Sequence, residues 1–99
     1  MLNIEKIASA AELKIALTGR LDTTTAPELE STLNESLDGV EQLLFDFENL
    51  DYISSAGLRV LLSAQKIMNK QGEMKVINCC DEIKEIFEVT GFADILTIE

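Results

Sequence analysis

Two adjacent hydroxyl residues, Ser54 and Ser55, stand where an apolar segment gives way to the start of a helix. The small residues Ala56 and Gly57 follow them directly. The first turn of a helix presents backbone N–H groups that lack partners, together with the positive end of the helix dipole. Because an anion is stabilised at such a place, the segment predicts a seat for a phosphate group. The small side chains would also let the backbone of another protein come close.

Two plainer interpretations of the same residues stay open. A serine in front of an apolar helix commonly does no more than cap it, which is worth about 1 kcal/mol. A glycine beneath a helix commonly does no more than permit close packing. Periodicity and capping alone do not separate these interpretations from a functional one.

The residue types exclude several kinds of chemistry. The 99 residues include no histidine, which removes Ser-His and Cys-His nucleophile pairs and histidine-based metal sites. Without a neighbouring base, Ser55 is a poor nucleophile, so we expect no catalytic residue, no enzyme and no small-molecule substrate. The P-loop and GxGxxG patterns of nucleotide-binding proteins are absent from the sequence. A net charge of −10, from 18 acidic and 8 basic side chains, disfavours nucleic acid and anionic membranes as partners.

Three aspartates, Asp22, Asp46 and Asp51, could form a carboxylate cluster for Mg²⁺, but solvated loop acids and a cap explain them more simply. We therefore expect no metal and no cofactor. Cys79 and Cys80 are adjacent, and a Cα separation of about 3.8 Å falls short of the roughly 4.4–6.8 Å of ordinary disulfides. A vicinal redox pair or a soft-metal site would need further ligands, so we expect reduced thiols.

Composition and length indicate one globular domain over residues 1–99. Hydrophobic residues make up 46% of the chain and charged residues 26%, which are values typical of folded proteins. No segment approaches the roughly 18 consecutive apolar residues of a membrane span, and the first residues lack the pattern of a signal peptide. These features predict a cytoplasmic protein.

Hydrophobic periodicity predicts the elements of the first half. A short strand is expected near residues 2–7, and a second strand over 13–17 alternates apolar with small or polar residues and ends near residue 20. Thr25 and Glu28 then have the spacing of a capping box, with Pro27 in the first turn of a helix. That helix should end at Asp38–Gly39. Its apolar face comprises Ala26, Leu29, Leu33 and Leu37.

The second half continues the alternation of strands and helices. The apolar run 43–47 predicts a central strand covered on both faces, and Asn49 and Asp51 would mark the loop after it. A largely apolar helix is expected over about 56–70, with Arg59, Ser63, Lys66 and Lys70 as its polar stripe. A strand over 74–77, a helix capped by Asp81 and stopped by Gly91, and a last strand over 95–98 complete the series. The order β-β-α-β-α-β-α-β indicates an α/β fold, with a mixed sheet of about four to five strands and helices packed on it.

Several motifs, taken in order, carry a resemblance to a known family. They are Leu17-Thr18-Gly19-Arg20-Leu21-Asp22, Leu44-Phe45-Asp46-Phe47, Tyr52-Ile53-Ser54-Ser55-Ala56-Gly57-Leu58, and Gly91-Phe92 before a short strand. Over nearly its whole length the chain resembles the STAS-domain proteins of the bacterial anti-sigma factor antagonist type. The resemblance implies a kinase substrate whose partner, an anti-sigma factor, is itself the serine kinase.

The resemblance also assigns residues. It implies phosphorylation at Ser55, with Asp22 in the neighbouring loop and Asp46 at the end of the central strand near the same surface. Many relatives have Asp where this chain has Ser54, which leaves Ser54 as a rival acceptor, and many have Ser or Thr where it has Ala56. The expected partner-binding residues are Asp22, Thr23, Asp46, Ser54, Ser55, Ala56, Gly57 and Arg59.

The expected function is a switch between partners. The unphosphorylated protein would bind the kinase and release a sigma factor, the phosphorylated protein would let go, and a protein serine phosphatase would reverse the change. Two alternatives remain: a STAS subunit of a transporter or stress-signalling scaffold that docks constitutively, and weak nucleotide binding at the Asp22, Asp46 and Ser55 surface.

Overall fold

The structure, a computed structural model, describes residues 2–99. Along these residues the secondary structure confirms the predicted α/β class and the predicted succession of strands and helices. The elements are β1 (Leu2–Ser9), β2 (Glu12–Leu21), α1 (Ala26–Ser36), β3 (Gln42–Ile53), α2 (Ser55–Gln71), β4 (Glu73–Ile77), α3 (Asp81–Thr90), the 3-10 helix η1 (Phe92–Asp94) and β5 (Thr97–Ile98).

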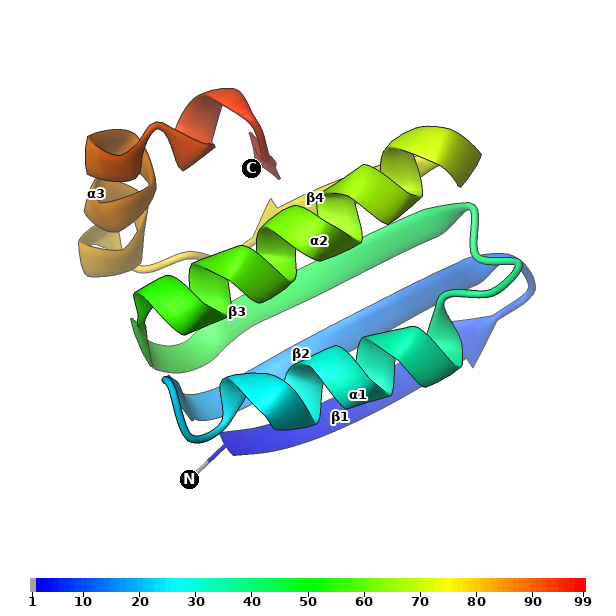
Figure 1. The fold of residues 1–99 in the computed structure, drawn as a ribbon, viewed down its shortest axis with the longest axis horizontal. Coiled ribbons are helices and arrows are strands. Elements are labelled where there is room, and N and C mark those ends of the chain that lie inside the picture. Colours follow the sequence, from blue (N-terminus) through cyan, green and yellow to red (C-terminus); the bar gives the residue numbers. More distant parts are fainter. Residues whose placement is uncertain (1) are drawn as a thin grey trace.

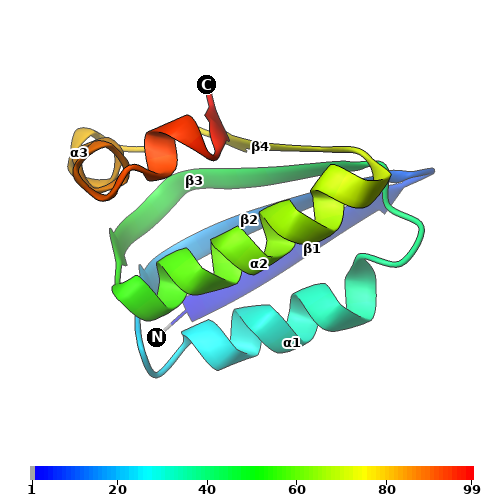
Figure 2. The same ribbon diagram turned by 45° about the horizontal axis from the view of Figure 1, so that its top comes forward.

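The strands form one mixed sheet in the order β1-β2-β3-β4-β5. β1 and β2 pair in antiparallel fashion through a tight turn, whereas β2, β3, β4 and β5 are parallel neighbours. Parallel neighbours need crossover connections, which α1, α2 and α3 with η1 supply. All three crossovers step in the same direction across the sheet. Because such connections are right-handed, α1 and α2 lie side by side over the same face (Figures 1 and 2).

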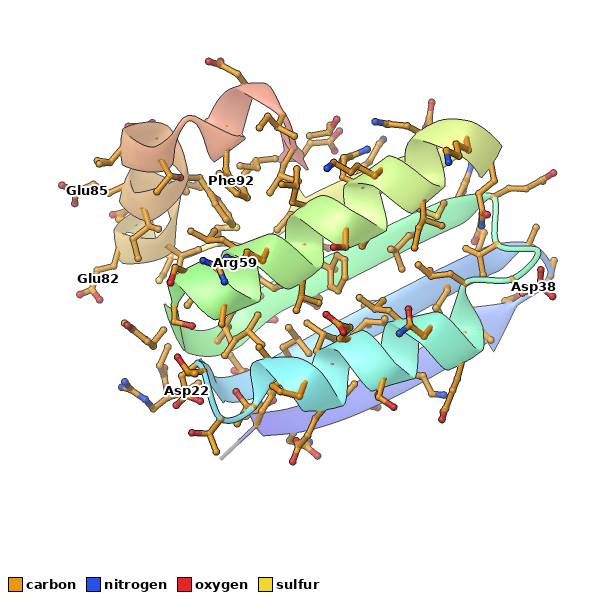
Figure 3. All side chains as sticks on the ribbon, in the orientation of Figure 1. Asp22, Asp38, Arg59, Glu82, Glu85 and Phe92 are labelled. Carbon is orange, nitrogen blue, oxygen red and sulfur yellow. The ribbon has the colours of Figure 1, made fainter. Side chains whose placement is uncertain are left out.

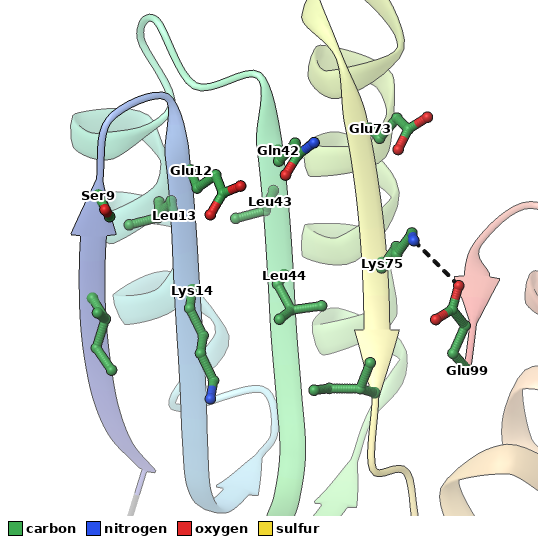
Figure 4. Close-up of a pocket in the computed structure, with 12 residues that line it drawn as sticks. Ser9, Glu12, Leu13, Lys14, Gln42, Leu43, Leu44, Glu73, Lys75 and Glu99 are labelled. Carbon is green, nitrogen blue, oxygen red and sulfur yellow. Dashed lines mark ion pairs between the residues drawn. The ribbon is translucent and has the colours of Figure 1, made fainter.

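In the part of the chain that the structure describes, the opposite face of the sheet has no helix on it (Figure 4). In β3 the side chains of Leu43, Phe45 and Phe47 are buried beneath the helices, whereas Leu44 and Asp46 on the other face are only half-buried. The prediction of a central strand covered on both faces is therefore wrong. A second helical layer would have required a reversal of strand order, which a continuous apolar run does not reveal.

The core lies between the helices and the sheet. Phe45 and Phe47 have ring centroids 5.9 Å apart, and Phe47 lies 6.5 Å from Phe87 of α3. Both ring pairs are tilted, at 53° and 33°, and aromatic pairs at such separations contribute roughly 0.5–1.5 kcal/mol beyond their buried area. Since Phe87 is fully buried, α3 is anchored beside β3, although it extends past the end of the sheet (Figure 2).

Several predicted boundaries need correction. β3 runs on to Ile53, so Asn49 and Asp51 belong to the strand and not to a loop, since Leu50 between them and Ile53 after them are buried. α3 has Cys80, not Asp81, at its N-cap position. Gly91 ends α3 in the left-handed conformation at φ 81°, as predicted. Within residues 2–99, none of the helices has the length and apolar character of a membrane span.

Candidate functional site

Two loops meet where the neighbouring parallel strands β2 and β3 end. The ladder between them pairs Arg20 with Tyr52 and Leu21 with Ile53. Immediately after the ladder, the Ser54 N–H donates to the Leu21 carbonyl at 2.8 Å. The loop before α1 and the start of α2 are thus held against each other, at the edge of a parallel sheet where binding sites commonly form.

The two adjacent serines have different surroundings. Ser54 is the N-cap of α2, with extended backbone at φ −97° and ψ 175°, and its Oγ accepts from the Gly57 N–H at 3.4 Å. Its side chain is half-buried. Ser55 is the first residue inside the helix and is exposed. The capping interpretation thus applies to Ser54, while the Ser55 hydroxyl is open to a visiting molecule.

Gly57 serves close packing in the first turn of α2. A Cβ atom built on it would lie 2.7 Å from Leu21 Cγ and 2.9 Å from Ile53 Cγ1. Both neighbours are buried core side chains, so neither can move away cheaply. The plainer interpretation of Gly57 therefore holds, and its contact with a partner stays a prediction. Ala56 beside it is half-buried and also packs on the core.

Asp22 organises the loop between β2 and α1. Its Oδ1 accepts from the backbone N–H groups of Thr24 at 3.0 Å and Thr25 at 3.1 Å. The Thr25 hydroxyl accepts from the Asp22 N–H at 2.9 Å and donates to the Arg20 carbonyl at 2.8 Å. These bonds fix the turn and leave Thr23 exposed at its tip.

The predicted capping box at Thr25 and Glu28 is wrong. Thr25 is at the N-cap position, but its φ of −97° and ψ of −19° are already helical and its side chain makes no cap hydrogen bond. Its hydroxyl is used by the Asp22 loop instead. Pro27 lies in the first turn of α1, as predicted.

The same hydrogen bonds favour the ionised form of Asp22. The Thr25 N–H contributes most to lowering the pKa of this carboxyl, partial burial opposes it, and the Thr24 N–H, the Thr25 hydroxyl and the Arg20 charge lower the pKa further. Asp22 therefore presents a negative charge beside the start of α2 at neutral pH.

Two residues that sequence reasoning did not assign to the site also flank it. The guanidinium of Arg20 lies over the Tyr52 ring, 4.3 Å from its centroid, and its Nε is 3.9 Å from Asp22 Oδ2. A cation over an aromatic face is attracted by the ring quadrupole. Tyr52 is 37% exposed, so the stacked pair forms part of the surface. Only the register between β2 and β3 brings these two side chains together.

Arg59 supplies a positive charge on the same helix as Ser55. It is exposed and lies four residues after Ser55, which places both residues on one face of α2. Figure 3 shows Arg59 on the first turns of α2 and Asp22 near the end of β2, on the same side of the molecule.

Asp46 is not where the sequence placed it. It lies in the middle of β3, seven residues before the strand ends, and its side chain is on the face opposite the helices. Although partial burial alone would raise its pKa, hydrogen bonds from the Glu48 N–H and the Asn78 amide, with the Lys14 charge, lower the pKa of Asp46. The expectation that Asp46 adjoins the Ser55 surface is wrong, because β3 continues past it.

The acidic and cysteine side chains considered above do not form a common site within the described residues. Residues 2–99 contain no group of three or more acidic, cysteine or histidine side chains arranged to hold a metal ion. Cys79 and Cys80 are both free thiols, the first buried and the second exposed. Burial raises the pKa of the Cys79 thiol to about 11, which keeps it protonated and unreactive at neutral pH.

Comparison with known proteins gives a consistent result. A model of the STAS domain family matches residues 2–99. The anti-sigma-B factor antagonist of Staphylococcus aureus strain NCTC 8325 is 31% identical over 99 residues, which cover 98% of this chain and 92% of that protein.

Solved structures share the fold. An anti-sigma factor antagonist from Mycobacterium paratuberculosis superposes with a TM-score of 0.89 at 18% identity, over 99% of this chain and 85% of that one. The antagonist SpoIIAA in its unphosphorylated form gives 0.76 at 16% identity, covering 100% and 87%. The Bacillus protein SpoIIAA in its phosphorylated form gives 0.75 at 17% identity, covering 100% and 91%.

Proposed function

The chain belongs to the STAS domain family, among the anti-sigma factor antagonists, and from that premise we propose that it is a binding module switched by phosphorylation of Ser55. In the unphosphorylated state it binds an anti-sigma factor that is also a serine kinase, which releases a sigma factor for transcription. The kinase transfers a phosphoryl group from ATP to the Ser55 hydroxyl and the complex separates. A protein serine phosphatase removes the phosphate and restores the binding form. The cycle takes place in the cytoplasm, together with these partners.

The observation that supports this proposal is that the two adjacent serine side chains have different surroundings. Ser54 uses its hydroxyl to cap α2, whereas Ser55 is exposed on the first turn with no such structural task. A kinase active site needs an accessible hydroxyl. The rival acceptor, Ser54, is half-buried and its Oγ faces the Gly57 N–H, so it is the less accessible of the two hydroxyls. The solved phosphorylated form of SpoIIAA supports the same kind of modification for a protein of this fold.

The surface that would meet the kinase surrounds Ser55. Thr23 and Arg59 are exposed, and Asp22 is held in a fixed turn beside them. We call Asp22, Thr23, Ser55 and Arg59 the switch surface. A rigid loop and a rigid helix start offer a partner a preformed surface, which limits the entropy lost on binding.

A phosphate on Ser55 acts through local charge. Phosphorylation adds about −1.5 to −2 charges, a small change for a chain of net charge −10. Within a desolvated contact the added dianion repels acidic groups and needs a cation. Arg59, four residues on, and the N-terminus of α2 can satisfy the phosphate within the chain. A local loss of about 3 kcal/mol weakens partner binding roughly a hundredfold without unfolding the domain.

The test pairs two substitutions. Wild type, Ser55→Ala and Ser54→Ala are each incubated with the candidate anti-sigma kinase, ATP and Mg²⁺, and mass spectrometry locates any phosphate. Wild type and Ser54→Ala should gain one phosphate at Ser55, and Ser55→Ala should gain none. A phosphate at Ser54, or none on wild type, would contradict the assignment.

Binding measurements separate switching from docking. By calorimetry, Ser55→Ala should bind the kinase as wild type does and Ser55→Asp should bind it roughly a hundredfold more weakly. Equal binding by all three proteins, without phosphate transfer, would favour constitutive docking in a transporter or scaffold. Titration with nucleotide and Mg²⁺ in the absence of kinase should give no heat, and measurable heat would favour nucleotide binding.

A further inference from the structure

Arg20 and Tyr52 form a stacked pair next to the switch surface. The residue that follows each of them, Leu21 in β2 and Ile53 in β3, is buried against the first turn of α2. Because side chains alternate between the two faces of a strand, Arg20 and Tyr52 point away from the helices. Both are exposed, so the pair extends the surface around Asp22 toward the open face of the sheet.

An irregularity in the ladder between β2 and β3 puts Tyr52 beside Arg20. Gly19 pairs with Leu50, and the next residue of β2, Arg20, pairs with Tyr52. One extra residue, Asp51, therefore lies between the two pairs in β3. Without this shift Arg20 would lie beside Asp51, where an ordinary ion pair could form. Extra residues of this kind redirect side chains and are over-represented next to active sites.

The stacked guanidinium is preorganised to bind an anion. It lies 4.3 Å from the centroid of the Tyr52 ring, and 55% of the Arg20 side chain is exposed. Its contact with Asp22 Oδ2, at 3.9 Å from Nε, is too long for a hydrogen bond. A guanidinium has five N–H donors in a planar fork, which matches the two oxygens of a carboxylate. The ring thus holds the fork in place and leaves its donors to a second molecule.

Resting on the proposed function, we propose that Arg20 binds a carboxylate of the kinase and that this contact selects which anti-sigma kinase the chain recognises. Tyr52 is a positioning residue, because it acts through Arg20. A standard interface of about 800 Å² per partner has a radius of roughly 16 Å. Tyr52 is separated from Ser55 by three residues, or at most about 11 Å of chain. An interface centred on Ser55 therefore includes the stacked pair.

The order of charges near Arg20 gives the selectivity its physical basis. The chain has a net charge of −10, and Asp22 and Asp51 are close to Arg20 along the two strands. A complementary kinase surface must be largely basic, yet opposite Arg20 it needs an acid. Like charges placed opposite each other across an interface are strongly unfavourable. A kinase with a basic residue at that position is therefore rejected, which is a common source of specificity.

The test measures how the kinase that modifies wild type binds and phosphorylates variants of Arg20. In calorimetry, Arg20→Gln should bind at least about thirtyfold more weakly than wild type. Arg20→Lys keeps the charge but loses the fork, and it should bind about tenfold more weakly. Phosphorylation of Arg20→Gln should show a raised KM and an unchanged kcat, because the contact is equally strong in the ground state and the transition state.

Lys70→Gln is the matched control. It removes the same charge from an exposed residue at the other end of α2, about 22 Å from Ser55. Its affinity and its KM should equal those of wild type. An equal effect of Lys70→Gln and Arg20→Gln would mean that only the net charge of the chain matters, which would overturn the proposal.

Tyr52→Leu tests the positioning role. Leucine keeps apolar bulk but loses the aromatic face, so binding should weaken about fivefold. The double variant Arg20→Gln/Tyr52→Leu should bind no more weakly than Arg20→Gln alone, since no cation is left to position. Additive losses would mean that Tyr52 contacts the kinase directly and would overturn this role. Thermal melting should show all variants folded, because the substituted side chains are on the surface.

Charge reversal tests for the carboxylate on the kinase. Arg20→Glu should not bind the unmodified kinase. Kinase variants selected from a library to bind Arg20→Glu should have Lys or Arg in place of one acidic residue, and they should bind the wild-type chain poorly. Recovery of binding through changes that leave every acidic residue of the kinase in place would contradict the proposal.

The assignment of Arg20 and the proposed function can fail separately. If Ser55 of wild type accepts phosphate while Arg20→Gln keeps the KM and the affinity of wild type, the function stands and the assignment of Arg20 is wrong. If wild type binds without phosphate transfer, the switch is wrong and the calorimetry alone decides the role of Arg20. If wild type binds no anti-sigma kinase, both proposals are wrong.

Discussion

The two ends of the parallel strands are built in different ways. At the carboxyl ends of β2 and β3, polar side chains shape their own loops and leave hydroxyl and charged groups on the surface, as Asp22 and Ser55 do. At the amino ends, polar groups tie separate elements together. Gln71 Nε2 at the end of α2 donates to the carbonyls of Leu37 at 2.6 Å and Val40 at 2.5 Å, both after α1.

Backbone bonds strengthen the same contrast. Near the amino ends, the Glu41 N–H donates to the Ala11 carbonyl at 2.7 Å, and the Glu73 N–H donates to the Glu41 carbonyl at 2.9 Å. These bonds join the starts of β2, β3 and β4 and so fix their register. We infer that the amino end holds the sheet together, which allows the carboxyl end to present hydroxyl and charged groups on short, rigid loops.

The largest effect is expected from a methyl group added at the amino end. A Cβ atom at Gly72 would overlap the carbonyl of Glu41, which is backbone and cannot swing away. Gly72→Ala should lower the free energy of unfolding by about 3 kcal/mol, measured by urea denaturation. Gly39→Ala is the matched control, because Gly39 has open space around it and only its φ of 80° to accommodate. It should cost about 1 kcal/mol. Equal losses in both variants would weaken the contrast between the ends.

The substitution Gly57→Ala tests whether packing also constrains the carboxyl ends of the parallel strands. Contact with Leu21 and Ile53 should cost about 2 kcal/mol, partly offset by the better helix propensity of alanine, about 1 kcal/mol. Urea denaturation should therefore show a clear but smaller loss than Gly72→Ala. Unchanged stability together with weaker kinase binding would instead make Gly57 a partner contact.

Substitutions of the two serines should distinguish an effect on the stability of the fold from an effect on switching. Ser54→Ala removes the cap of α2 and should lower the free energy of unfolding by about 1 kcal/mol. Ser55→Ala should leave stability within about 0.5 kcal/mol of wild type, as expected for an exposed side chain. Denaturation curves of the two variants give both values. A larger loss for Ser55→Ala would mean that Ser55, not Ser54, supports the helix.

Local patterns in the sequence are sufficient to predict the helices and strands. They are not sufficient to predict how distant elements pack against one another. Alternation over residues 13–17 and the glycine at position 91 identify a strand and a helix end through nearby residues alone. The sheet face without helices follows from the handedness and direction of three crossovers, which no local pattern encodes. The polar residues Asn49 and Asp51 indicated a loop, yet Leu50 and Ile53 keep this stretch in the sheet.

The candidate site shows the same limit. Short motifs predict Ser55 and Asp22 as site residues, whereas Arg20 and Tyr52 become neighbours only through a ladder that contains register shifts. Thr25 was expected to cap a helix because of its spacing from Glu28. Its hydroxyl bonds the Asp22 N–H and the Arg20 carbonyl instead, since those groups come within reach only after β2 and α1 are packed.

The smallest expected effect is the loss at acidic pH of the stability that Asp22 contributes. The hydrogen bonds to Asp22 lower its pKa in the folded protein, so their contribution to stability is complete above the unfolded pKa near 3.9. That contribution is lost as pH falls through the lower folded value, because the protonated carboxyl no longer attracts the Thr24 and Thr25 N–H groups. Urea midpoints of wild type and Asp22→Ala should therefore differ at neutral pH and begin to converge as the pH falls below about 4. A difference that persists undiminished in acid would mean that Asp22 supports the loop through packing and not through charge. The carboxyl end would then be held by the same kind of contact as the amino end.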